Sequence, residues 1–231
     1  MNLCVIPARG GSKRIPRKNI KEFCGKPMIA YAISAAKDSG LFDHIVVSTD
    51  DPEISSIAKE WGAQVPFFRP PELSDDHTPT VPVIVHALQA CEAIGWDAEY
   101  VCCIYPCVPF VQVADIQKTF TLLVNSQTDY VFPVAKFPST IQRALKRNED
   151  GFTLPFYPQY ELVRTQDLEP AYFDAGQFYW GISNAWESNP RIHACGLGYE
   201  LPTWRVVDID DDDDWKRAEI LYDIFSERRQ Q

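Results

Sequence analysis

The stretch Ile6-Pro7-Ala8-Arg9-Gly10-Gly11-Ser12-Lys13-Arg14-Ile15-Pro16-Arg17-Lys18-Asn19 decides how the rest of the chain is interpreted. It follows an apolar run at residues 3–6 that is typical of a short buried strand. The strand therefore leads directly into a loop with two adjacent glycines and a cluster of cations. Seven of the 22 lysines and arginines lie between residues 9 and 26, so an acidic protein gathers positive charge at one strand end.

The adjacent glycines, Gly10 and Gly11, let the backbone turn tightly and bring N–H groups close to an anion. Arg9, Lys13 and Lys18 would then neutralise a ligand with several negative charges, such as a triphosphate. The alternatives are a solvated basic loop and a basic patch for nucleic acid. The loop lies at a strand end, where nucleotide crevices occur, and this favours the nucleotide. It matches neither the P-loop motif nor the dinucleotide-binding fingerprint.

Two motifs in this stretch, Ile-Pro-Ala-Arg-Gly-Gly-Ser-Lys from Ile6 and Ile-Pro-Arg-Lys-Asn-Ile from Ile15, resemble a known family signature. The signature is that of CMP-sialic acid synthetases and related cytidylyltransferases for acidic sugars, and the resemblance covers nearly the whole chain. It implies an α/β, Rossmann-like nucleotidyltransferase fold of the nucleotide-diphospho-sugar transferase type, with a mostly parallel central sheet flanked by helices.

The composition indicates one folded domain spanning residues 1–231, because 45% of the residues are hydrophobic and 13% are aromatic. A net charge of −10 argues against a nucleic-acid partner. There is no run of about 18 apolar residues and no signal-peptide pattern, so we expect no membrane partner and a cytoplasmic location. The seven cysteines form no C-x-x-C pair, and we interpret them as reduced thiols rather than a zinc site or a catalytic thiol.

Strand-like and helix-like segments alternate along the chain, which predicts a parallel sheet covered on both faces. Strands are expected at residues 3–6, 44–48, 65–68, 100–105, 129–135, 177–182 and 205–210. Helices are expected at residues 28–39, 51–61, 80–94, 113–124 and 212–225, followed by a solvated tail at 227–231.

The alternation stops at residues 136–173, a segment rich in proline and aromatic residues. An excursion of this length from a compact domain is usually functional or an interaction element. We therefore expect it to contact substrate, to mediate dimerisation, or both. The resemblance implies a homodimer.

A run of acids at residues 208–214 forms a second candidate site. On an extended chain Asp208 and Asp210 point the same way, and a triphosphate site needs a hard cation with oxygen ligands. We interpret them as ligands of Mg²⁺, for which Mn²⁺ can substitute, and the resemblance places a metal motif Asp-x-Asp here. The alternative is helix capping, which explains Asp212 to Asp214.

Residues 164–181 mix hydrogen-bonding groups with aromatic rings, as sugar pockets do. The part Asp-Ala-Gly-Gln-Phe-Tyr-Trp-Gly, from Asp174, resembles pseudaminic acid cytidylyltransferases more than sialic acid enzymes. The turn that begins at Tyr105 also departs from the sialic acid pattern, so the roles known there are not transferred. The candidate sugar-binding residues are Arg164, Gln166, Tyr172, Asp174 and Gln177. Phe178 and Trp180 also suit a core or an interface.

The resemblance implies transfer of CMP from CTP to the anomeric hydroxyl of a nine-carbon 2-keto sugar acid, with release of pyrophosphate. The sugar supplies the nucleophile, so catalysis would rest on positioning and charge stabilisation by Arg9, Lys18, Asp208 and Asp210. The expected triphosphate residues are Arg9, Gly10, Gly11, Ser12 and Lys13, with Lys18 and Asn19 near the α-phosphate and sugar. Four further positions resemble those lining a cytidine pocket: Arg69, Asp76, Thr78 and Thr80.

The acceptor expected from the resemblance is pseudaminic acid, activated for bacterial surface glycan or flagellin glycosylation. N-acetylneuraminic, legionaminic and related acids are alternative acceptors for the same chemistry. A non-catalytic nucleotide-binding regulator is a remote alternative, since both the cation loop and the aspartate pair are intact.

Overall fold

In the computed structural model, which describes residues 1–229, strand β1 (Asn2–Pro7) is covered on both faces. Its side chains alternate between two cores. Leu3 and Val5 pack on one side, while Cys4 and Ile6 pack on the other. The continuous apolar run at the start of the sequence is therefore an interior strand of the sheet, buried on both faces.

The sheet has the strand order β11-β6-β10-β5-β1-β4, with the short strand β9 paired to β6. Five strands run in one direction, while β9 and β10 run in the other, so the expectation of a mostly parallel sheet is confirmed. The bounds are β4 (His44–Ser48), β5 (Tyr100–Ile104), β6 (Tyr130–Lys136), β9 (Tyr172–Asp174), β10 (Phe178–Ile182) and β11 (Gly196–Leu201).

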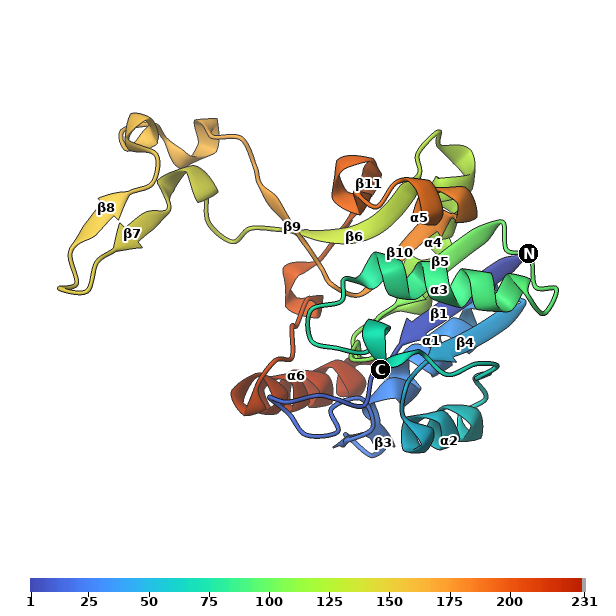
Figure 1. Ribbon diagram of the computed structural model, residues 1–231. Helices are drawn as coiled ribbons and strands as arrows, with labels where there is room; N and C mark the ends of the chain where they lie inside the picture. The colour runs from blue at the N-terminus through green and yellow to red at the C-terminus, as the bar shows by residue number, and fades with distance from the viewer. Residues whose placement is uncertain (230–231) are drawn as a thin grey trace.

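Helices cover both faces of the sheet (Figure 1). One face packs against α1 (Met28–Ser39), α2 (Pro52–Glu60) and α4 (Val113–Asn125), and the other against α3 (Thr80–Glu92) and α5 (Ser183–Ser188). The last helix, α6 (Asp212–Arg229), packs against the N-terminal loop in a third cluster, near the small hairpin β2 (Glu22–Phe23) and β3 (Lys26–Pro27). Within residues 1–229, no helix is both long and apolar enough to cross a membrane.

Two expected strands are absent, and both segments use their backbone groups differently. Residues 65–68 form no strand, and Gln64 just before them makes an isolated bridge with Val46; Pro66 lacks the N–H that a continuing ladder needs. At residues 205–210 the carbonyls of Arg205 and Ile209 accept hydrogen bonds from the side chains of Gln177 and Lys18. The expected helix at 212–225 continues to Arg229, and residues 230–231 of the expected tail lie outside the described residues.

The segment at residues 136–173 forms an arm that projects away from the sheet (Figure 1). It leaves the sheet at the end of β6 and returns along β9, where Lys136 pairs with Tyr172. The arm carries the hairpin β7 (Leu145–Arg147) and β8 (Thr153–Pro155). Apolar side chains on it face solvent, including Leu162, which is 97% exposed, and Phe152, which is 73% exposed. The arm thus lacks a hydrophobic core of its own in the single chain.

Candidate active site

A cavity of about 500 Å³ lies where the carboxyl ends of the parallel strands meet, the edge at which open α/β sheets bind ligands. Pro7 at the end of β1 and Tyr105 after β5 both line it. Nine of the eleven predicted nucleotide-binding residues also line it: Arg9, Ser12, Lys13, Lys18, Asn19, Arg69, Asp76, Thr78 and Thr80. The fold therefore brings the N-terminal loop together with a segment about 65 residues further along the chain.

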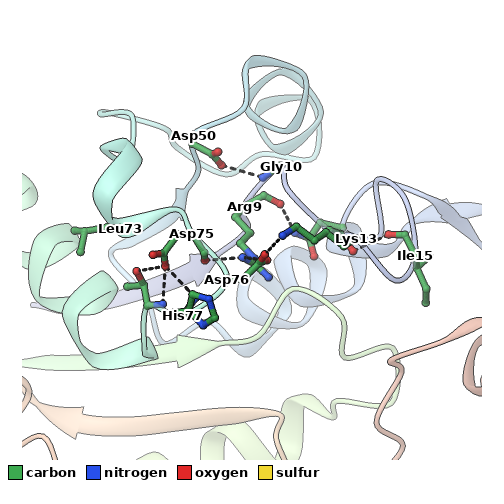
Figure 2. Close-up of polar contacts among 12 residues, drawn as sticks. Arg9, Gly10, Lys13, Ile15, Asp50, Leu73, Asp75, Asp76 and His77 are labelled. Carbon is green, nitrogen blue, oxygen red and sulfur yellow. Dashed lines mark hydrogen bonds and ion pairs between the residues drawn. The ribbon is translucent and has the colours of Figure 1, made fainter.

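The two glycines of the N-terminal loop do not line this cavity. The Gly10 N–H donates to Oδ1 of Asp50 at 2.9 Å, as Figure 2 shows. A Cβ on Gly10 would lie 2.6 Å from Oδ2 of Asp51, so close packing against this carboxylate accounts for the glycine. Gly11 has no other atom within 4 Å of where a Cβ would stand. The expected contact between these N–H groups and an anion is thus not preformed at Gly10.

The cations of the loop are held by an acid from across the cavity (Figure 2). Asp76 forms ion pairs with Arg9, at 2.7 Å, and with Lys13. Both cations hold the pKa of Asp76 below its ordinary value, with Lys13 the larger cause. Asp75 shapes the same turn, because its Oδ1 accepts from the N–H and the hydroxyl of Thr78 at 2.7 and 2.6 Å. Asp76 therefore already forms ion pairs with two of the cations that we expect to bind a triphosphate.

Arg17 has a structural role. Its backbone has φ of 58°, in the left-handed region, and its guanidinium pairs with Asp51 and with Glu53. Asp51 also caps α2 by accepting from the N–H groups of Glu53 and Ile54 at 2.9 and 3.0 Å. Arg17 is the main reason that the pKa of Asp51 falls to about 2. This clamp fixes the N-terminal loop to α2.

Arg69 forms the buried floor of the cavity. Its guanidinium donates to the Ser48 carbonyl at 2.5 Å, to the Ser48 hydroxyl at 3.2 Å and to the Leu73 carbonyl at 3.4 Å. Burial lowers the pKa of Arg69 to about 10, so it stays charged at neutral pH. The residue ties the end of β4 to the loop that carries Asp76.

Lys18 and Asn19 form a second polar group in the lining of the cavity. Lys18 donates to the Ile209 carbonyl at 2.6 Å and lies 3.6 Å from Oδ1 of Asp210. Asn19 is buried, donates to the Arg9 carbonyl at 2.9 Å and accepts from the Cys107 thiol at 3.3 Å. Burial raises the pKa of Cys107 to about 12, so the thiol stays protonated and can donate.

A second cavity of about 410 Å³ shares Pro79, Thr80 and Tyr105 with the first. The Thr80 and Tyr105 hydroxyls are 2.8 Å apart, at the boundary between the two spaces. The far wall consists of Tyr179 and residues 190–194, which include Arg191 and His193. A donor molecule in the first cavity and an acceptor in the second would therefore adjoin each other.

Comparisons with known proteins identify the family of this chain. The profile of the cytidylyltransferase family matches residues 3–171. The chain is 40% identical to the pseudaminic acid cytidylyltransferase of Campylobacter jejuni over 98% of each chain. This chain is a member of the cytidylyltransferase family. It is therefore a nucleotidyltransferase enzyme, as the sequence indicated.

Two further similarities refine the picture of this cytidylyltransferase. It is 50% identical to the CMP-N,N'-diacetyllegionaminic acid synthase of Campylobacter jejuni over 86 residues, or 37% of each chain. Its fold resembles that of a CMP-2-keto-3-deoxy-manno-octonic acid synthetase solved with CTP, with a TM-score of 0.70 and 16% identity over 96% of this chain and 98% of that one. The expected Rossmann-like nucleotidyltransferase fold is thereby confirmed.

The acidic segment of the cytidylyltransferase contributes unequally to the cavity. Asp210 lines it and pairs with Arg14 at 2.7 Å, whereas Asp208 is exposed outside the lining. Both carboxylates are near enough to the thiol of Cys107 to raise its pKa, after the larger effect of burial. Asp211 instead caps α6 through the N–H groups of Asp213 and Asp214. Asp212 to Asp214 lie in the first turn of α6, where their charges suit the helix dipole as expected, but the capping side chain is that of Asp211.

The predicted sugar-binding residues do not converge. Arg164 and Gln166 lie on the arm, and Tyr172 is exposed at its base. Gln177 is buried, with Nε2 donating to the Arg205 carbonyl at 2.8 Å. Asp174 lies behind the second cavity, where it contacts two residues of the lining.

Of the residues that line the second cavity, the sequence analysis identifies Thr80 but misses Tyr105, Tyr179 and residues 190–194. The turn that begins at Tyr105 departs from the family pattern, and Tyr179 is one of several neighbouring aromatic residues, so neither side chain stands out in the sequence. The wall at residues 190–194 carried only a weak signal, a proline followed by an arginine and a histidine between a helix and a strand.

Proposed function

We propose that this enzyme transfers CMP from CTP to the anomeric hydroxyl of pseudaminic acid, releasing pyrophosphate. The observation that carries the proposal is the 40% identity, over 98% of each chain, to a pseudaminic acid cytidylyltransferase. The adjoining cavities support it, because one is lined by cations and the other has room for a sugar acid.

In this proposal the triphosphate enters the first cavity and takes over the charges that Asp76 now neutralises. Arg9 and Lys13 bind the phosphates in exchange for their ion pairs with Asp76, whose carboxylate is 31% exposed and can then be hydrated. Lys18, on the wall that it forms with Asn19, stabilises charge that develops at the α-phosphate. Asn19 orients this wall through its hydrogen bond to the Arg9 carbonyl.

The acidic segment suits a magnesium site that the substrate completes. Among residues 1–229 no group of three or more metal-binding side chains forms a cage. Mg²⁺ is usually held by one or two carboxylates together with substrate phosphates and water, so Asp208 and Asp210 are a sufficient protein contribution. Bound there, Mg²⁺ or Mn²⁺ would neutralise phosphate charge and favour the departure of pyrophosphate.

The acceptor lies in the second cavity with its anomeric hydroxyl toward the first. Thr80 and Tyr105 are at the boundary that this hydroxyl must cross, and Arg191 provides a cation for an acidic acceptor. The sugar supplies the nucleophile, so the enzyme has to orient two bound molecules and exclude water. Arg164, Gln166 and Tyr172 lie on or at the base of the arm, so in this proposal they contact the sugar bound by a second copy of the chain.

A homodimer formed through the arm is part of the proposal. The arm exposes a row of large apolar side chains and has no core in the single chain: Ile141, Leu145, Phe152, Leu154, Phe156, Tyr157 and Leu162. A cytoplasmic location follows from the need for CTP and for reduced thiols.

The second candidate acceptor is a legionaminic acid, favoured by the 50% identity over 86 residues to a legionaminic acid enzyme. The test is steady-state release of pyrophosphate from CTP and Mg²⁺ with pseudaminic, legionaminic and N-acetylneuraminic acids supplied separately. We expect the highest kcat/KM with pseudaminic acid. A higher kcat/KM with either other acid would reassign the acceptor, and binding of CTP without release with any acid would indicate a regulator.

A further inference from the structure

The second cavity contains an oriented histidine. Nε2 of His193 lies 2.7 Å from Oδ2 of Asp174, and the same oxygen accepts from the Tyr179 hydroxyl at 2.6 Å. The Gly176 N–H donates to Oδ1 of Asp174 at 2.8 Å. The carboxylate is therefore held from three directions, and it holds the imidazole in turn.

The packing around His193 restricts the ring further. It contacts Phe132 edge to face, with ring centroids 5.1 Å apart, and lies against Tyr179 at 6.3 Å. Tyr179 is buried, and its pKa is raised by burial, so its hydroxyl stays a donor to Asp174. His193 itself lines the cavity and its side chain is 63% exposed, so a ligand there can reach it.

This arrangement selects one tautomer of the imidazole. In a neutral ring, an Nε2–H that donates to a carboxylate leaves Nδ1 as a hydrogen-bond acceptor. Nδ1 is then the polar atom that His193 offers to the cavity. A sugar acid carries hydroxyl and acylamino groups, both of which donate hydrogen bonds.

We propose that His193 determines acceptor specificity, with Nδ1 accepting a hydrogen bond from an N–H or O–H group of the sugar acid while Asp174 positions the ring. The inference rests on the proposed function, because it assigns a residue to the acceptor of that reaction. Asp174 then acts through His193 as a positioning residue, instead of contacting the sugar as the sequence suggested.

Two substitutions separate the two ring nitrogens. In H193N the side-chain amide stands near the place of Nδ1, so it can still accept from the sugar but loses Asp174. In H193Q the amide reaches the place of Nε2 and keeps Asp174 but offers nothing at Nδ1. We expect H193Q to raise the KM for pseudaminic acid about tenfold and to leave the KM for CTP unchanged, since an unpaired donor on the substrate is costly. H193N should stay within about threefold of the wild-type protein.

Specificity and coupling provide further readouts. The ratio of kcat/KM for pseudaminic acid over N-acetylneuraminic acid should fall about tenfold in H193Q. The double variant D174N/H193Q should have the same KM for pseudaminic acid as H193Q alone. Both changes act on the same hydrogen bond, the one between His193 and the sugar. H44Q is the matched control, since His44 stacks on Trp96 with ring centroids 3.7 Å apart and lines neither cavity.

The outcomes distinguish this inference from the proposed function. Equal kinetics for H193Q and the wild-type protein, or equal losses in H193Q and H193N, would overturn the role of His193 while the reaction stands. A rise in the KM for CTP equal to that for the sugar would also overturn it, because the change would then be structural. A wild-type protein that turns over no acid would overturn both.

Discussion

Replacing Arg205 with methionine is expected to destabilise the enzyme strongly, because it leaves a buried carboxylate without its cation. Nη1 of Arg205 lies 2.5 Å from Oδ2 of Asp115, and the side chains are only 13% and 6% exposed. Without the guanidinium, the hydrogen bond that remains for Asp115 is from the Tyr199 hydroxyl at 3.2 Å. Breaking a buried pair from one side costs about 3–5 kcal/mol. That is a large part of a typical free energy of unfolding of about 5–15 kcal/mol.

The assay is urea unfolding at neutral pH, followed by tryptophan fluorescence. R205M should lower the unfolding midpoint with little change in slope, since the buried surface is nearly the same. The double variant D115L/R205M should recover most of the loss, because an apolar pair of similar volume needs no charge compensation. A small deficit should remain, since Asp115 lies in the first turn of α4 and interacts with its dipole.

The result that would refute this reasoning is a loss of less than about 1 kcal/mol in R205M, which would mean that water reaches Asp115 and replaces the cation. A double variant that is no more stable than R205M would also contradict it. The pair matters for function as well, because Arg205 directly precedes the irregular segment that includes Asp208 and brings Asp210 to the cavity.

Three further predictions address the metal, the arm and the loop clamp. D210N should raise the Mg²⁺ concentration for half-maximal activity about tenfold or more. D213N, which changes a carboxylate that is 95% exposed, is the control and should not change this concentration. Equal Mg²⁺ titrations for the two variants would leave Asp210 with a structural role only. L162D should convert a dimer to a monomer in sedimentation experiments. I220D is the control, because Ile220 on α6 is also exposed, at 63%, and this variant should stay dimeric. A wild-type protein that sediments as a monomer would contradict the dimer proposal. R17M should lose roughly 1–2 kcal/mol of stability at pH 7, a figure reduced from the full pKa difference because Arg17 is 38% exposed. The pKa of Asp51 is depressed to about 2, so this stability is present above the unfolded-state pKa near 4 and disappears as the pH falls through 2; a difference from the wild-type protein that is independent of pH would contradict the clamp.

Local signals in the sequence located most of the sheet and helices. Gly40 has φ of 66° at the end of α1, and Asp51 followed by a proline begins α2, as those residue types indicate. The misses came from partners that local signals do not contain. The sequence analysis did not predict β11, because Gly196 and Gly198 are not typical of a strand. The structure explains Gly196, since a Cβ there would lie 2.5 Å from the ring of Phe132 on the neighbouring strand. The apolar residues at 206–209 suggested a strand, but the backbone there bonds to distant side chains.

The candidate site divides in the same way. The cation loop was visible because its charges are adjacent in the sequence, and the cavity contains most of them. Sequence alone could not separate Lys18, which lines the cavity, from Arg17, which is used by Asp51. Nor could it place His193 beside Asp174, since that contact depends on how β9, β10 and the turn before β11 meet.

The central claim is the chemical reaction, and phosphorus NMR of the protein with CTP, Mg²⁺ and pseudaminic acid tests it most directly. The account predicts that the three CTP signals are replaced by those of pyrophosphate and one phosphodiester, in equal molar amounts, and only while the acid is present. Orthophosphate with CDP, or CTP signals that persist beside bound nucleotide, would contradict it.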